Sequence, residues 1–182
     1  MTQVDRLDQW LAQERDVVAR VAAGAGSGVA KPEQVAGRSG LELMQAMLRG
    51  ELPSPPIART LNFQLMEAEA GRAVFQGTPG PEHLNPMGTV HGGWYATLLD
   101  SALGCAVHTM MPAGRGYTTA ELGVNLVRAI GAKAPRVRAE GKVIHVGKQL
   151  ATAEGRLHDA RGRLYAHAST TCLVFPLPGP RE

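Results

Sequence analysis

The sequence predicts an α+β fold, in which one curved antiparallel sheet wraps around a single long central helix and extra helices stand at the N-terminus. Three observations predict this fold. The segment 94–110 is apolar on nearly all sides, which is typical of a helix that other elements cover. Two segments before it and four after it alternate between apolar and polar residues, as half-buried strands do. Because one long helix must cover the apolar faces of six strands, a sheet that curls around that helix satisfies both patterns.

Helical patterns open the chain. Apolar residues recur at helical spacing at Val4, Leu7, Leu11, Val18 and Val21. The glycine-rich residues 24–28 indicate a flexible joint. Ser39 and Glu42 then form a capping box that begins a second helix, and Gly50 ends it. We expect the prolines that follow to keep the chain extended, namely Pro53, Pro55 and Pro56.

Strand patterns follow. Residues 61–78 predict a hairpin with its turn at Ala70 and Gly71, and the proline- and glycine-rich residues 79–90 predict a loop. After the central helix, which Pro112 and Gly114 end, strands are expected from residue 117 onward and over 137–146, 150–157 and 164–175. The last three are joined as hairpins by turns at 146–148 and 159–162. The chain therefore divides into an N-terminal helix with its joint (1–38), a main domain (39–176) and a frayed tail (177–182).

Composition excludes several classes of protein. With 182 residues, of which 44% are apolar and 19% charged, the chain can bury one sizeable core. It has no apolar stretch long enough to span a membrane, and its first twenty residues are too charged for a signal peptide. Two cysteines, Cys105 and Cys172, are too few for a disulfide framework and fit a reducing compartment. We therefore expect a cytoplasmic protein with no membrane partner.

Charge is distributed unevenly along the chain. Residues 123–182 hold ten basic and four acidic residues, which suggests an anionic partner. Only 4% of residues are aromatic and none are interleaved with the basic ones, so nucleic acid is disfavoured as that partner. No metal site is expected, because the histidines lack close ligand spacing and accompanying carboxylates: His83, His108, His145, His158 and His167.

The segment 83–100 carries the strongest functional signal. Asp100 is an acid inside an otherwise apolar helix, where a carboxylate is costly unless it is paired or hydrogen-bonded. It is either a reactive group or a buried anchor for neighbouring backbone. Gly92 and Gly93 stand where the helix begins, so their N–H groups can hold an oxyanion at its positive end. Alternatively, the glycine pair simply marks the end of the preceding loop.

Spacing relates these two features. Gly92 and Asp100 are eight residues apart, which is about 12 Å along a helix that rises about 1.5 Å per residue. One substrate carbonyl cannot touch both within the same subunit. If both act on it, the acid must come from a second copy whose helix runs antiparallel beside the first. The pair therefore predicts a site at a dimer interface.

Asn85, Gly88, His91-Gly92-Gly93 and Asp100 together resemble the signature of the hotdog-fold thioesterases of the PaaI (phenylacetate-pathway) type. Asn85 precedes His91 by six residues, and His91 precedes Asp100 by nine. The likeness continues through residues 123–128, 145–148 and 162–166, so it covers about residues 40–175. The N-terminal forty residues lie outside it.

The resemblance implies hydrolysis of an acyl-coenzyme A thioester without a cofactor. Asp100 would be the nucleophile or the general base. The Gly92 N–H, with His91 as a further candidate, would polarise the thioester carbonyl, and Asn85 would position its loop or the attacking water. In relatives a hydroxyl on the strand after the helix supports the carboxylate. Thr119 matches that position best, and Thr118, one residue away, would face the other side of a strand.

The resemblance also implies residues that bind the substrate. We expect Gly93, Arg128, Gly147 and Lys148 to bind acyl-CoA, with basic side chains and the N–H groups of the 146–148 turn meeting its phosphates. Further basic candidates lie in the same third of the chain, namely Arg136, Arg138 and Arg163. The acyl group, aromatic or aliphatic, is left open. The expected assembly is a homodimer that pairs into a homotetramer.

Two other functions fit a hotdog chain. A non-catalytic acyl-CoA sensor fused to a DNA-binding segment is disfavoured, because residues 1–60 hold seven basic and seven acidic residues and offer no basic surface. A hydratase or dehydratase of this fold places its catalytic aspartate before a histidine in a loop. Here the acid follows His91 by nine residues, inside the helix.

Overall fold

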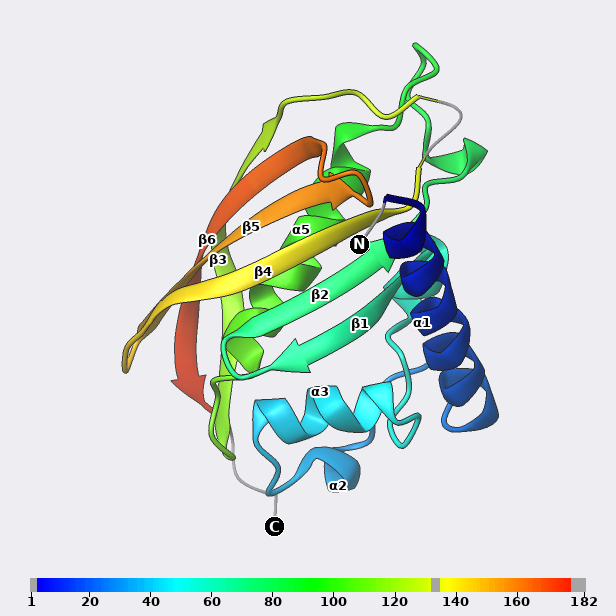
Figure 1. The fold of residues 1–182 in the computed structure, drawn as a ribbon. Coiled ribbons are helices and arrows are strands. Elements are labelled where there is room, and N and C mark those ends of the chain that lie inside the picture. The colour runs from blue at the N-terminus through cyan, green and yellow to red at the C-terminus, as the bar shows by residue number, and fades with distance from the viewer. Residues whose placement is uncertain (1–2, 132–134, 178–182) are drawn as a thin grey trace.

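A single antiparallel sheet curves around one central helix, α5, in the computed structural model, which describes residues 3–131 and 135–177 (Figure 1). The strands are β1 (Phe63–Glu69), β2 (Arg72–Gly77), β3 (Arg115–Leu126), β4 (Val137–Val146), β5 (Leu150–Asp159) and β6 (Leu164–Pro176). The helices are α1 (Gln3–Ala23), α2 (Pro32–Val35), α3 (Gly40–Leu48), α4 (Pro56–Thr60), α5 (Gly92–His108) and the 3₁₀ turn η1 (Pro81–His83). The strand order is β1-β2-β4-β5-β6-β3. The predicted fold class is confirmed.

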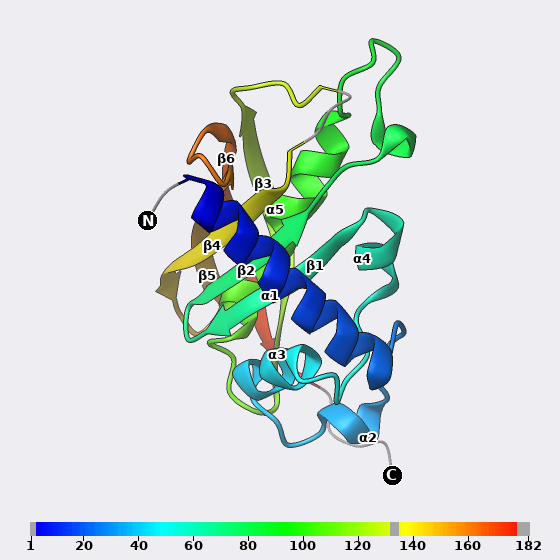
Figure 2. The same ribbon diagram turned by 45° about the vertical axis from the view of Figure 1, so that its right-hand side comes forward.

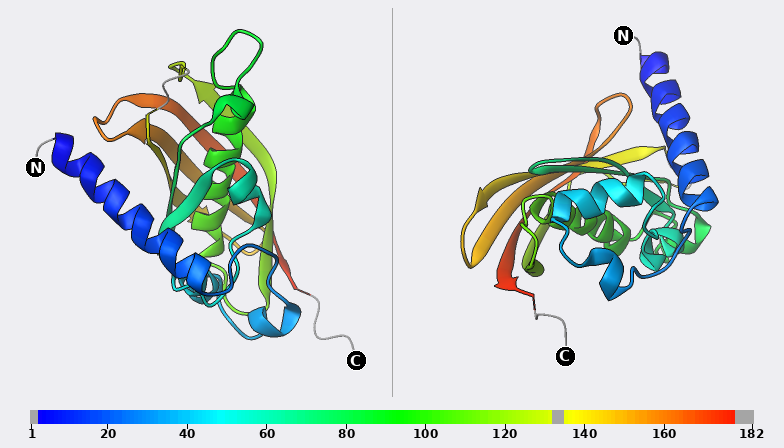
Figure 3. Two further views of the ribbon diagram at one scale, coloured as in Figure 1. Left: turned by 90° about the vertical axis from the view of Figure 1, so that its right-hand side faces the viewer. Right: turned by 90° about the horizontal axis from the view of Figure 1, so that it is seen from below.

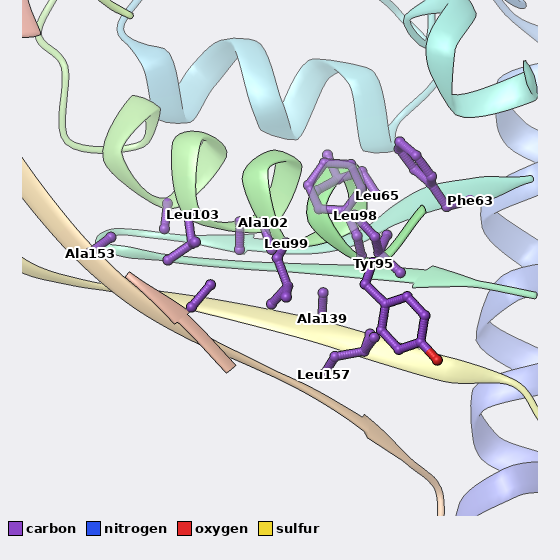
Figure 4. Close-up of a cluster of buried hydrophobic side chains, with 14 of the residues drawn as sticks. Phe63, Leu65, Tyr95, Leu98, Leu99, Ala102, Leu103, Ala139, Ala153 and Leu157 are labelled. Carbon is purple, nitrogen blue, oxygen red and sulfur yellow. The ribbon is translucent and has the colours of Figure 1, made fainter. Parts of the chain in front are cut away.

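Small residues on the strands let α5 lie close against the sheet. Leu98, Leu99 and Leu103 on the helix are completely buried and point toward the strands, among alanines of β4 and β5 (Figure 4). At Gly141 of β4, an added Cβ would lie 2.3 Å from the carbonyl oxygen of Ala102, so only glycine fits there. Close packing of this kind makes the core sensitive to added volume.

The order of the strands leaves β3 at one edge of the sheet. Although β3 follows α5 directly in the chain, it pairs with β6, the last strand. Within the described residues, β3 has no strand on its other side. A bulge between Thr119 and Glu121 bends this strand along the length of α5. This arrangement places β3 side chains next to the helix that carries Asp100.

The N-terminal helix packs across the outer face of the sheet, over β1 and β2 (Figures 2 and 3). The prediction of which α1 residues face the core is only partly correct. Val21 is buried, but Leu7 is 37% and Val18 48% exposed, whereas Trp10 and Val17 face the sheet. Val4 lies outside the residues whose burial is described. The 1–38 boundary stays a prediction, although α1 is bound firmly to the main domain.

A buried arginine explains the shifted face of α1. The Arg138 side chain is buried on the outer face of β4, and its three guanidinium nitrogens donate to the side-chain oxygens of Gln76 (2.7 Å), Glu67 (3.0 Å) and Gln13 (2.7 Å). The Trp10 ring covers it, with the guanidinium carbon 4.5 Å from the ring centre. Because the strand surface here is polar, α1 turns polar and aromatic residues toward it, which hydrophobic periodicity alone does not detect.

Two local predictions before the sheet are wrong. Residues 24–28 are not a flexible joint, because Ala25 N–H donates to Gly50 O (2.9 Å) and Gly28 N–H to Ser54 O (2.9 Å), which fixes them against the chain after α3. The segment after Pro55 is not extended, because Pro56 begins α4 at the first helical position, where its missing N–H costs nothing. By contrast, α3 begins at Ser39 with the predicted capping box.

Other predicted boundaries agree with the structure. The β1–β2 hairpin turns at Gly71, which has φ of +75° as glycine allows. β4 spans the predicted residues, and β5 and β6 form hairpins over the predicted turns. Residues 178–182 of the predicted tail lie outside the described residues. None of the described helices is long and apolar enough to cross a membrane.

His108, at the C-terminal end of α5, should make the fold less stable in mild acid. Its Nδ1 is buried without a hydrogen-bond partner among the described residues, and burial lowers the pKa of its imidazole. The unfolded chain, with a histidine pKa of about 6.5, therefore binds the proton more readily than the folded one. Stability contributed by neutral His108 is complete above that pKa and falls as pH drops below it, by at most about 1.4 kcal/mol per pH unit for one proton.

Urea unfolding at pH 7 and pH 5 checks this expectation. His108→Phe should lose less stability between the two pH values than the wild type does. His145→Gln, which changes an exposed histidine on β4, should keep the wild-type difference. Equal differences in the wild type and His108→Phe would contradict the expectation.

Candidate active site

The first turn of α5 presents one free N–H group. His91 is the N-cap residue, and its Nδ1 accepts a hydrogen bond from Gly93 N–H (2.9 Å). Within residues 3–131 and 135–177, the neighbouring Gly92 N–H meets no acceptor. Because this group lies at the positive end of a 17-residue helix, it is well placed to hold a negatively polarised oxygen.

The same hydrogen bond orients His91. Because Nδ1 accepts, the neutral ring carries its proton on Nε2, which makes that nitrogen a donor on an exposed side chain. A Cβ on Gly93 would lie 3.0 Å from Nδ1, so a larger residue would crowd this cap. The Gly93 N–H is therefore used in the helix cap and is not available to a ligand, contrary to the role expected for Gly93. Gly92 N–H and Nε2–H of His91 are the candidate donors at this end of the helix.

Asn85 organises the loop that precedes α5. Its Oδ1 accepts from the N–H groups of Met87 (2.9 Å) and Thr89 (3.2 Å), and its Nδ2 donates to the Thr89 hydroxyl (2.8 Å). These bonds form a closed turn in which Gly88 has φ of +78°. These bonds fit the first role expected for Asn85, positioning of the loop, and its role toward an attacking water stays a prediction.

His83 also positions this loop, a role that the sequence analysis missed. The buried ring accepts from Gly80 N–H at Nδ1 (2.8 Å), and its Nε2 lies 3.1 Å from Thr60 O. Its carbonyl accepts from His91 N–H (2.8 Å), so it fixes the N-cap of α5. Only the buried setting distinguishes this histidine from an exposed loop residue, and the sequence pattern carries no sign of that burial.

Asp100 has one oriented oxygen and one open oxygen. The Thr119 hydroxyl donates to Asp100 Oδ1 at 2.9 Å, across the contact between α5 and β3. Among the described residues, Oδ2 accepts no hydrogen bond. Thr118 is exposed, on the other face of β3, so Thr119 is the threonine of this pair that contacts Asp100. Asp100 itself is half-buried, which leaves it accessible from one side.

Cys105 is not a rival nucleophile. Burial, with a smaller contribution from the nearby Asp100 charge, raises the pKa of its thiol to about 12. A thiol with so high a pKa holds almost no thiolate near neutral pH, and the thiolate is the reactive form. Of these two side chains on α5, the Asp100 carboxylate is therefore the candidate for chemistry.

A single subunit does not bring the two ends of this site together. Gly92 is the first residue of α5 and Asp100 lies eight residues further, about 12 Å along the axis at about 1.5 Å per residue. Two hollows of about 410 and 340 Å³ lie on the described surface, under α1 and beside the β5–β6 turn. Neither is lined by Gly92 or Asp100.

The predicted substrate-binding residues fall into two separate places. Arg128 is exposed in the segment after β3, near the start of α5, and its carbonyl accepts from the Tyr95 hydroxyl (3.3 Å). Lys148 is exposed in the β4–β5 turn, where its carbonyl accepts from the guanidinium of Arg115, the first residue of β3. The two are separated by the length of β3, about 40 Å at about 3.3 Å per residue.

Several groups expected near the phosphates have other partners within the subunit. Gly147 N–H donates to Leu150 O (2.7 Å), so it is not free for a phosphate. Arg138 is buried under α1, and the other two arginines are already paired, Arg136 with Glu14 (3.1 Å) and Arg163 with Asp159 (2.7 Å). The described residues hold no cluster of three or more His, Cys, Asp or Glu side chains suited to a metal ion.

Comparison with known proteins shows a likeness to thioesterases. Residues 87–166 match the family model of the thioesterase superfamily, and no curated protein matches the chain. The matched range contains Gly92, Asp100, Thr119 and Arg128 but not Asn85. Together with the solved structures below, this match supports a thioester hydrolase of the hotdog fold.

Solved structures make the likeness more specific. A putative thioesterase described as phenylacetic acid degradation-related, from Ralstonia eutropha, is 29% identical, covers 71% of this chain and 98% of its own, and has a TM-score of 0.65. A mutant of phenylacetic acid degradation protein PaaI from Thermus thermophilus is 27% identical, with 65% and 97% covered and a TM-score of 0.59. A hypothetical thioesterase with coenzyme A from Streptococcus pneumoniae, 22% identical, shares the fold, with 65% and 89% covered and a TM-score of 0.58. The resemblance to PaaI-type hotdog thioesterases is confirmed.

Proposed function

We propose that this protein is an acyl-CoA thioesterase that hydrolyses its substrate to a free acid and coenzyme A. The observation that carries the proposal is the pairing, on one helix, of a free Gly92 N–H with an Asp100 carboxylate oriented by Thr119 (2.9 Å). The structure of a similar thioesterase with coenzyme A supports coenzyme A as the thiol that is released. A cytoplasmic location stays a prediction.

The proposed chemistry uses each of these groups. The thioester carbonyl oxygen accepts from Gly92 N–H and from Nε2–H of His91, which stabilise negative charge on that oxygen as the carbonyl is attacked. Thr119 holds one oxygen of Asp100, and the open Oδ2 acts on the carbonyl carbon. It does so by attacking directly, to form a mixed anhydride that water then cleaves, or by taking a proton from water as the water attacks. On either route the carbon–sulfur bond breaks and the thiolate leaves, taking up a proton to become free coenzyme A.

We further propose that the functional unit is a homodimer. Two α5 helices lying antiparallel would set Gly92 of one subunit beside Asp100 of the other, which one subunit cannot do. The half-buried Asp100 and the unpaired edge of β3 within the described residues support this arrangement. Pairing of dimers into a tetramer stays a prediction.

A spectrophotometric screen of thiol release tests the proposed function. Purified protein should release free thiol from at least one acyl-CoA in a series of aromatic and aliphatic acyl groups, with kcat/KM of about 10⁴ M⁻¹ s⁻¹ or more for the best substrate. Binding of acyl-CoA without any thiol release would instead favour the sensor function. Formation of an enoyl thioester from 3-hydroxyacyl-CoA, again without thiol release, would favour the dehydratase.

A further inference from the structure

The segment 126–130, which leaves the end of β3, crosses beside the start of α5 (Figure 1). Hydrogen bonds fix its backbone. Val127 and Arg128 both donate to Tyr165 O (2.9 and 3.1 Å), and Val90 N–H donates to Ile130 O (3.0 Å). The Ile130 side chain is only 1% exposed, so it anchors the segment in the core. The segment is therefore an ordered wall beside the free Gly92 N–H.

The Tyr95 hydroxyl connects this wall to the helix. It accepts from Ile130 N–H at 2.6 Å and donates to Arg128 O at 3.3 Å. The Tyr95 ring lies in the hydrophobic core below α5, with its oxygen directed away from the packed leucines (Figure 4). Since Tyr95 follows Gly92 by three residues on the same helix, the bridge sets the spacing between the segment and the oxyanion end of α5.

The exposed side chains of the segment run from apolar to basic along the chain. Leu126 is 52% and Val127 54% exposed, and Arg128 follows them, also exposed. Leu126 Cδ1 lies 3.0 Å from the place where a Cβ of Gly92 would be, and Val127 and then Arg128 follow it along the chain. An acyl-CoA has the matching order, from thioester through the largely uncharged pantetheine arm to the phosphates. Exposed apolar side chains gain by covering such an arm, and a cation by meeting phosphate.

We propose that residues 126–128 bind the pantetheine arm and the adjoining phosphates, and that Tyr95 is the positioning residue that holds them in register with the Gly92 N–H. This inference rests on the proposed thioesterase function and deepens it. It assigns contacts along the substrate: Val127 meets the arm beyond its first amide, and Arg128 meets the phosphates. Tyr95 touches no substrate and acts only through the segment.

Tyr95→Phe removes the bridging hydroxyl and keeps the ring in the core. Three thioesters of one acyl group are compared: the acyl-CoA, the acyl-pantetheine, which lacks the phosphates, and the acyl-N-acetylcysteamine, which lacks most of the arm. Tyr95→Phe should raise KM for the first two by about five- to tenfold with kcat within about twofold, because it weakens binding that is equal in the ground and transition states. The truncated substrate should react as it does with the wild type.

Thr109→Val is the matched control. Thr109, just past the other end of α5, is also a buried hydroxyl that accepts from a backbone N–H, of Gly71 (2.8 Å), and donates to a backbone carbonyl, of Ala106 (2.6 Å). Its loss should lower stability to unfolding by urea about as much as Tyr95→Phe does, roughly 1–3 kcal/mol for a buried backbone group left unpaired. KM for all three substrates should stay unchanged.

Two surface variants test the contacts even if Tyr95→Phe fails to fold. Val127→Ser should raise KM for acyl-CoA and acyl-pantetheine alike, whereas Arg128→Gln should raise it for acyl-CoA alone. Equal changes for all three substrates, or a Val127→Ser variant that leaves KM unchanged and dissociates the oligomer, would overturn the inference. A wild-type protein that cleaves none of the three would instead count against the proposed function itself.

Discussion

Asp100→Asn should lower kcat for the best thioester by about a hundredfold or more, the loss expected when a general base or nucleophile is removed. The amide has nearly the same size and keeps an oxygen that can accept from the Thr119 hydroxyl, as Asp100 Oδ1 does at 2.9 Å. The fold and the binding of substrate should therefore survive. Thiol release measures the first effect, and calorimetric binding of a non-hydrolysable thioether analogue of acyl-CoA measures the second.

Glu154→Gln provides the matched control for this change. It also neutralises one carboxylate, but on the exposed outer face of β5 and away from α5. Its kcat and KM should equal those of the wild type. Turnover by Asp100→Asn within about threefold of wild type would show that Asp100 takes no part in the chemistry.

Gly92→Pro should have an effect of similar size, because proline removes the Gly92 N–H, which meets no acceptor among the described residues. Loss of a single oxyanion donor lowers kcat by about 10²- to 10³-fold in other acyl-transfer enzymes. The fold should tolerate it. Gly92 is the first residue of α5, where proline is favoured, and His91 has the extended φ of −62° and ψ of 137° that a residue before proline prefers.

Gly92→Ala separates the N–H from the added side chain. Like proline, alanine adds a Cβ about 3.0 Å from Leu126 Cδ1, the flexible end of an exposed side chain that can move. Unlike proline, it keeps the N–H, so kcat should stay within about threefold of wild type. A similar loss of kcat in both variants would mean that crowding of Leu126, and not the missing donor, causes the defect.

Much of the fold follows from patterns along the chain. α5 is apolar around most of its surface, and the strands alternate with a period of two, so both could be predicted without tertiary information. The face of α1 could not, since it depends on Arg138, which is far away in the sequence but lies buried beneath Trp10. The start of α4 was missed because Pro56 can either extend a chain or begin a helix.

The site shows the same division. Asp100 and the pair Gly92 and Gly93 could be found from the sequence. Asp100 is a charged residue among apolar ones, and the two glycines lack side chains where the apolar helix begins. The choice of Thr119 over Thr118 needed the register of β3 against α5, which the bulge after Thr119 sets. The roles of Tyr95 and His83 arise only when loops distant in sequence meet at the start of α5, so no local pattern announces them.

Mixing two inactive variants tests most directly the claim that each active site is shared between subunits. Asp100→Asn keeps Gly92, and Gly92→Pro keeps Asp100, so every mixed dimer holds one intact composite site and one site that lacks both groups. After subunit exchange, verified by native mass spectrometry, an equal mixture has mixed dimers as half of its molecules. Its rate of thiol release per subunit should then be about one quarter of the wild-type rate, as a two-fold symmetric dimer requires. A mixture that exchanges fully but stays as inactive as its two parents would contradict the shared site.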